Sequence, residues 1–192
     1  MKSRLLIIVV LLCAFFVAAA AYPRLFVPAS SSDLALEVFA EKTTLRVSDQ
    51  IKVAASIRNK GSKTVLLVQP GDGSESGMRT PSLKWDVIQF DETSRTAMPV
   101  LSEHHRLCGN INPLKMDEIF ILQPGGTRKF DEWIPPFTKP GKYKVVLSYA
   151  NIPSKKWDGI LMGEHNPLAM WFVRNSTECL LESNAIIFTV SE

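Results

Sequence analysis

The sequence predicts an all-β fold, an antiparallel β-sandwich of seven or eight strands that is interrupted by one long insertion. Apolar and polar residues alternate with a period of two along most of the chain, which is typical of strands with one buried face. Glycine and proline turns separate these segments. With 192 residues, 46% of them hydrophobic and 21% charged, the chain fits one ordinary globular domain and not a disordered, collagenous or multi-span membrane protein.

The first residues have the pattern of a secretory signal peptide. Lys2 and Arg4 supply a positive start, residues 5–17 form an unbroken apolar run, and alanines follow. We therefore predict a signal peptide over residues 1–21, a linker rich in proline and serine over residues 22–32, and the sandwich domain over residues 33–192. The alternative is an uncleaved anchor, because residues 5–22 are just long enough for a tilted membrane span.

The predicted destination is therefore the periplasm or the extracellular space, with membrane attachment only if the leader stays uncut. Without the two leader cations, 20 basic and 19 acidic residues remain, so the domain is nearly neutral. Strongly basic surfaces are the electrostatic mark of nucleic-acid binding and of anionic membrane binding. The charge balance thus predicts no nucleic-acid partner.

The first strands are predicted over residues 34–40 and 51–58, where apolar residues occupy every second position. The turn at residues 59–62 follows, and we expect Gly61 to supply the positive φ that such a turn often needs. Residues 64–69 are then predicted as the return strand of a hairpin.

A second hairpin-like unit is predicted further along the chain. Residues 119–123 and 127–133 have strand patterns, and the turn Pro124-Gly125-Gly126 separates them. The remaining strands are predicted over residues 83–87, 142–149 and 184–191.

Two segments break this rhythm. Residues 70–81 are rich in glycine and serine, and we predict a solvated loop because the spacing of neither a nucleophile elbow nor an EF-hand calcium loop is present. Residues 151–183 form the long insertion, where function often lies on a rigid sandwich. Within it, Asn166 and Pro167 predict the start of a short helix with Arg174 in its last turn.

Several segments resemble a known group of domains. Residues 45–53 and 57–61 look like the opening of bacterial exported immunoglobulin-like domains. Residues 120–127, followed by Trp133 and residues 141–145, are similar to the same domains and to the Bacillus intracellular proteinase inhibitor-like family. The resemblance covers about half of the mature chain. It implies an immunoglobulin-like sandwich, a fold that hosts many functions.

Removal of the leader leaves Cys108 and Cys179, and an even pair in an exported protein predicts one disulfide. The bridge would close a loop of about 70 residues and stabilise the fold by roughly 4 kcal/mol. Two buried thiols, or a reactive or metal-binding role, are the alternatives. His104 and His105 are only weak metal candidates, because zinc needs three or four converging ligands and a disulfide removes the thiolate. We predict no metal site and no cofactor.

The insertion is unusually rich in aromatic and methionine side chains for a surface connection. Exposed groups of this kind mark partner or glycan surfaces. The alternative is that they seal an open end of the sandwich. Asn175 also begins a glycosylation sequon. The candidate partner-binding residues are Trp157, Met162, His165, Met170, Trp171 and Phe172.

These observations predict a non-enzymatic exported module that binds or structures the cell envelope, with an unidentified protein or glycan as its partner. No nucleophile motif is present, so we predict no catalytic residue. The alternatives are a secreted proteinase-inhibitor-like protein and, third, a metal-dependent envelope enzyme.

Overall fold

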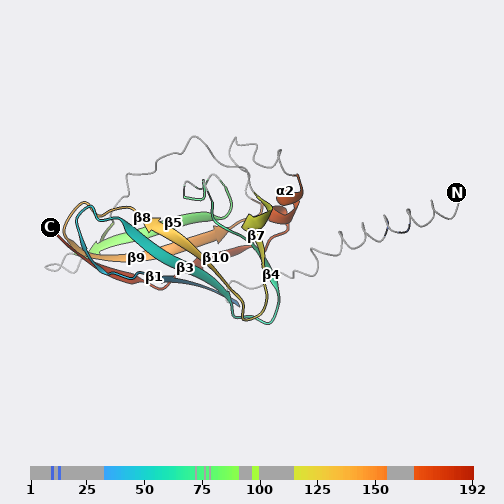
Figure 1. Cartoon of the computed structure of the whole chain (residues 1–192), viewed down its shortest axis with the longest axis horizontal. Helices are drawn as coiled ribbons and strands as arrows, with labels where there is room; N and C mark the ends of the chain where they lie inside the picture. Colours follow the sequence, from blue (N-terminus) through green and yellow to red (C-terminus); the bar gives the residue numbers. More distant parts are fainter. Residues whose placement is uncertain are drawn as a thin grey trace.

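The computed structural model describes Val10, Cys13 and residues 33–71, 73–75, 77, 79–90, 97–99, 115–154 and 167–192. Most of this part of the chain is extended (Figure 1). The strands are β1 (Leu34–Phe39), β2 (Thr44–Arg46), β3 (Ile51–Asn59), β4 (Val65–Val68), β5 (Ser82–Phe90), β6 (Ala97–Pro99), β7 (Ile119–Leu122), β8 (Thr127–Ile134), β9 (Gly141–Asn151), β10 (Cys179–Glu182) and β11 (Ile186–Ser191). The helical elements are the short 3₁₀ helix η3 (Met116–Glu118) and the α-helix α2 (Pro167–Arg174).

The strands form a sandwich of two main sheets, with a small sheet and α2 at one end (Figure 1). One main sheet has the order β1-β3-β8, and the other has the order β2-β11-β9-β5-β6, with β10 also paired to β9. The small sheet pairs β4 with β7. Every strand pair in the described part of the chain is antiparallel except β2 with β11. The predicted all-β antiparallel sandwich is confirmed, but the described residues form eleven strands and not the predicted seven or eight.

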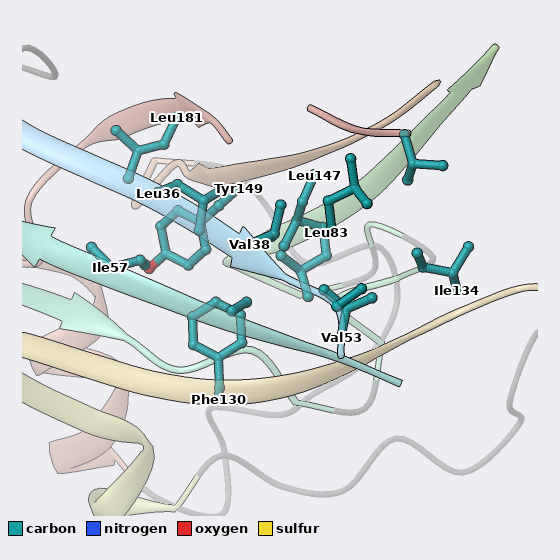
Figure 2. Packing of buried hydrophobic residues seen from close by; sticks show 14 of the residues in the cluster. Leu36, Val38, Val53, Ile57, Leu83, Phe130, Ile134, Leu147, Tyr149 and Leu181 are labelled. Carbon is teal, nitrogen blue, oxygen red and sulfur yellow. The ribbon is translucent and has the colours of Figure 1, made fainter. Parts of the chain in front are cut away.

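Period-two alternation places one face of each long strand in the core. In β3, Val53 and Ile57 are fully buried while Lys52 is exposed, and in β9, Leu147 and Tyr149 are fully buried. These side chains come from opposite sheets and meet in one cluster (Figure 2). Burial of a large apolar side chain contributes about 1.5–3 kcal/mol, so this core is the main source of stability.

Both predicted hairpins are wrong, because each turn joins strands of different sheets. β3 pairs with β1 and β8, whereas β4 pairs with β7. The chain segments β3–β4 and β7–β8 therefore turn a corner side by side, at residues 59–64 and 123–126. All four residues of β4 are buried, whereas the return strand of a surface hairpin would have one wet face.

Asn59 joins the two turns at this corner. Its backbone amide donates to the Gly126 carbonyl and its own carbonyl accepts from the Gly125 amide, both at 2.9 Å. Its side-chain Nδ2 donates to the carbonyls of Lys63 at 2.7 Å and Leu122 at 3.0 Å. The fully buried Asn59 thus replaces the ladder bonds that both chain segments lose where they bend.

Gly61 is needed at this corner for space and not for a positive φ, which corrects the sequence-based expectation. A Cβ added to Gly61 would lie 2.8 Å from the Cβ of Asp33. The amide of Gly61 donates to Asn59 Oδ1 at 3.0 Å. The positive φ in the facing turn belongs to Gly125, at 75°.

The predicted helix is confirmed as α2, which begins at Pro167 and has Arg174 in its last turn. The insertion contains more sheet than expected, because β10 returns along β9 with Cys179 opposite Asn151.

Residues 155–166 lie outside the described residues. So do the predicted leader and linker except for Val10 and Cys13, and these assignments stay predictions. Within the described ranges, no helix has the length and hydropathy of a membrane span.

The side chain of Asn184 closes the outer edge of β1, which lies at the end of its sheet. Its Oδ1 accepts from the Val38 amide at 2.9 Å, and its Nδ2 donates to the Val38 carbonyl at 3.0 Å. The neighbouring Ser183 forms an isolated bridge with Leu36. The segment after β10 therefore connects the two main sheets along this edge.

Candidate functional site

The described residues between 70 and 81 pack against the sandwich, which corrects the prediction of a solvated loop. Ser74, Arg79 and Thr80 are buried, each with 2% or less of its surface exposed. The Ser74 carbonyl accepts a hydrogen bond from the Leu83 amide at 2.9 Å. The segment thus folds back onto the start of β5.

This segment and two strands enclose a cleft of about 260 Å³ between β5 and β8. Glu132 enters the cleft from β8, the last strand of its sheet. It occupies the inner face of the sheet, because it pairs with the buried Val53 and alternates with the buried Phe130 and Ile134. The lining residues are Pro70, Gly71, Ser74, Glu75, Leu83 and Glu132.

Glu132 is partly withdrawn from water, which makes its carboxyl group a weaker acid than that of an exposed glutamate. Burial, followed by the negative charges of Glu75 and Asp131, raises the pKa of Glu132 from 4.5 to about 7. Glu75 lines the same cleft, whereas Asp131 is exposed on the outer face of β8 and pairs with Lys52 at 2.6 Å. None of the described lysines and arginines forms an ion pair with Glu132 or Glu75. The cleft therefore presents two carboxylates that no described lysine or arginine neutralises.

A buried guanidinium lies directly behind the cleft wall at Gly71. The Arg79 side chain has no exposed surface, and its Nη2 is 3.1 Å from Oε1 of Glu118. Nη2 faces Glu118 as an ion pair without hydrogen-bond geometry, and Nε and Nη1 have no hydrogen-bond partner in the part of the chain that the structure covers. A Cβ added to Gly71 would lie 2.8 Å from Arg79 Nη2 and 2.7 Å from Glu118 Oε1. A side chain at position 71 would therefore have to displace the ends of the Arg79 and Glu118 side chains.

Beside this ion pair, a buried hydrogen-bond network fixes the segment to β9 and to the end of α2. Asn151 Oδ1 accepts from the Thr80 hydroxyl at 3.3 Å. Asn151 Nδ2 donates to the Ser176 hydroxyl at 2.8 Å and to the Thr177 carbonyl at 2.7 Å. Because buried, satisfied polar networks are rigid, this one anchors Thr80 to β9 and to the end of α2.

None of the cleft residues is among the site residues predicted from the sequence. One signal points to Glu132, since the alternation that places Phe130 and Ile134 inside also places Glu132 inside. No comparable signal exists for Arg79, which lies in a segment of glycine and serine and becomes buried through distant partners.

The predicted disulfide is not supported and stays a prediction. Cys179 is a free, buried thiol in the structure, and burial raises the pKa of this thiol to about 12. Cys108 lies outside the described residues, as do the weak metal candidates His104 and His105. Across the described ranges, no group of three or more His, Cys, Asp and Glu residues is arranged to hold a metal ion.

The structure describes half of the predicted partner-binding residues. Met170, Trp171 and Phe172 are partly buried on α2, while Trp157, Met162 and His165 lie outside the described residues. The aromatic rings of Trp171 and Phe172 contact each other edge to face, with centroids 5.0 Å apart. The buried side of the helix packs on the small sheet through Ala169, Val173, Val68 and Ile119.

The predicted glycosylation sequon is part of the helix end. Asn175 Nδ2 donates to the Trp171 carbonyl at 2.7 Å, and Ser176 and Thr177 are buried. The sequon amide is therefore occupied in the folded chain.

Two carboxylates on a small cleft suit two kinds of chemistry. They bind a positively charged group, or they transfer protons near neutral pH when one of them has a raised pKa. The Ser74 hydroxyl is not set up as a nucleophile, because it is buried and its Oγ accepts from the Gly71 amide at 3.0 Å. The geometry thus favours binding of a cation.

Comparison with known proteins adds no functional family. No family model matches the sequence, and no curated protein matches it. The chain is similar in structure to a CARDB domain of the PF1109 protein from Pyrococcus furiosus, determined with di-metal ions, at 13% identity and a TM-score of 0.35, covering 83% of this chain and 88% of that one. It is similar to the sporulation control protein Spo0M from Bacillus subtilis at 9% identity and a TM-score of 0.41, covering 83% and 50%. A β-glucosidase from Listeria innocua matches at 12% identity and a TM-score of 0.34 over 83% of this chain and 16% of the enzyme.

Proposed function

We propose that this chain is an exported, non-enzymatic binding module, and that the cleft between β5 and β8 binds a positively charged group of its ligand. The observation that carries this proposal is the position of Glu132 on the inner face of an edge strand, in a cleft that Glu75 also lines. A partly buried carboxylate without a counter-charge destabilises the fold. A cationic ligand supplies that counter-charge.

A second role for such a residue is protection of the sheet edge, because an inward-pointing charge discourages pairing with another chain. That role accounts for Glu132 alone. It requires neither a cleft nor the second carboxylate of Glu75, so binding accounts for more of the site.

The size and walls of the cleft limit the group that fits. Its volume of about 260 Å³ is below the roughly 300–1,000 Å³ typical of pockets for drug-sized molecules. Pro70 and Leu83 provide apolar wall beside the two carboxylates. This combination suits an ammonium or guanidinium group on a short carbon chain.

The binding proposal predicts that n-butylamine and methylguanidine bind the purified protein at pH 8. Calorimetric or NMR titration should show affinity about tenfold or more weaker in Glu132→Gln and in Glu75→Gln, because each loses a charge-assisted contact. Asp131→Asn is the matched control, since Asp131 lies on the outer face of the same strand. Equal affinity in all four proteins would overturn the proposal. Hydrolysis of a glycoside panel that disappears in Glu132→Gln would replace binding by catalysis.

Export is the second part of the proposal, and it is supported by the charged, apolar and alanine-rich start of the chain. Mass spectrometry of natively expressed protein should find an N-terminus at Ala21 or Tyr22. Recovery of Met1 in a membrane-bound product would show that the leader is an anchor.

A further inference from the structure

The cation-binding role of the cleft leaves the Arg79 guanidinium unexplained. A guanidinium has five N–H donors and never loses its charge in proteins. Glu118 lies against one edge of this group, at 3.1 Å from Nη2, and its other oxygen accepts from the Lys115 amide at 2.8 Å. Buried donors without acceptors are costly, and each one in a native structure calls for a specific explanation. Nε and Nη1 of Arg79 are such donors in the described part of the chain, on a side chain with no exposed surface.

The position of this guanidinium relative to the cleft suggests an explanation. Gly71 lines the cleft, and its missing Cβ would lie 2.8 Å from Arg79 Nη2 and 2.9 Å from Arg79 Cζ. Gly71 therefore lies between the cleft and the guanidinium of Arg79. Exposure of Arg79 to the cleft requires a local shift of Gly71, which breaks its two hydrogen bonds with Ser74, at 3.0 Å from the Gly71 amide and at 2.9 Å to the Gly71 carbonyl.

The charges around Gly71 define the ligand that would satisfy all of them. A purely cationic ligand leaves Nε and Nη1 of Arg79 without acceptors, and a purely anionic ligand meets the negative charges of Glu75 and Glu132. A ligand with both charges avoids both penalties, because carboxylates are the preferred bidentate partners of guanidinium groups.

We infer that the cleft takes a small zwitterion of the amino-acid class, with its ammonium group at Glu75 and Glu132 and its carboxylate at Arg79 after Gly71 shifts. This inference rests on the proposed function, since the ammonium half of the ligand is the cation of that proposal. It adds a second, anionic subsite that the cation-binding proposal does not need.

The inference is tested with probes that differ only in the carboxylate. Glycine, β-alanine and 4-aminobutyrate form a length series, and methylamine, ethylamine and n-propylamine are their counterparts without the carboxylate. At pH 8, at least one zwitterion should bind about tenfold or more tightly than its matched amine. If no zwitterion binds more tightly than its amine, the inference is wrong. Amine binding that is still lost in Glu132→Gln would leave the proposed function standing.

A double variant assigns the effect to Arg79. Arg79→Gln combined with Glu118→Gln removes the ion pair without leaving one charge buried alone. The preference for the zwitterion should disappear in this variant while the amine affinity stays unchanged. The matched control is Lys52→Gln with Asp131→Asn, which removes an exposed ion pair and should keep the preference.

A measurement on the unmodified protein covers the case in which the double variant does not fold. The NMR resonance of Arg79 Nε should shift when the tighter zwitterion is added and should stay in place when the matched amine is added. An unchanged Nε resonance at saturating zwitterion would overturn the inference.

Discussion

Replacement of Asn59 by alanine is expected to lower the free energy of unfolding by about 3 kcal/mol, because it removes three hydrogen bonds of about 1 kcal/mol each, one of them buried. The Asn59 side chain is fully buried and bonds to Lys63, Leu122 and Gly61. These bonds hold the corner where β3–β4 and β7–β8 bend together. Urea denaturation at neutral pH measures the change.

Asn175→Ala is the control for this prediction, because the Asn175 side chain donates one bond, to the Trp171 carbonyl, from a partly buried position. We expect its effect to be about 1 kcal/mol. A loss in Asn59→Ala no larger than that in Asn175→Ala would show that the corner is held by its backbone bonds.

Glu132→Gln is expected to stabilise the protein by about 3 kcal/mol above pH 8 and to have little effect near pH 4. The folded state holds the Glu132 proton with a pKa of about 7, compared with 4.5 for the free group. Between these values the folded state binds more protons than the unfolded state, so the wild type loses stability as pH rises through this window. Glutamine stays neutral and escapes this loss.

Urea melts of wild type and Glu132→Gln at pH 4, 6 and 8.5 measure the effect. Asp131→Asn is the control and should not reproduce this pH dependence. A constant difference between wild type and Glu132→Gln at all three pH values would mean that Glu132 titrates like an ordinary surface carboxylate.

The same substitution should therefore change stability and ligand affinity in opposite directions. Residues that only support the fold lose stability when they are replaced, whereas binding residues are often held at a cost in stability. A more stable Glu132→Gln protein that binds n-butylamine poorly would identify Glu132 as a binding residue.

The sequence predicted the long strands and the helix because their signals are local. Residues 51–58, 142–149 and 184–191 carry period-two alternation, and α2 begins at a proline. Strand partners were predicted incorrectly because a turn such as residues 59–62 has the same composition whether it closes a hairpin or turns a corner between sheets. The short strands β2 and β10 were missed since three or four residues show too little alternation.

The cleft was harder to predict because its residues become significant only through distant contacts. Arg79 and Glu118 are 39 positions apart, and Thr80 reaches Asn151 across 71 positions. Such partners leave no periodic signal in a segment of glycine and serine. Glu132 differs, because the alternation of β8 places it inside without any tertiary information.

The contacts of Asn184 with Val38 bear on how this protein behaves at high concentration. Outer strands of open sheets are templates for edge-to-edge association, which leads to aggregation and strand exchange between molecules. The amide of Asn184 satisfies both backbone groups of Val38 near the end of β1, so an incoming strand finds no free donor or acceptor at that residue. The Asn184 side chain thus keeps neighbouring molecules from joining their sheets through β1.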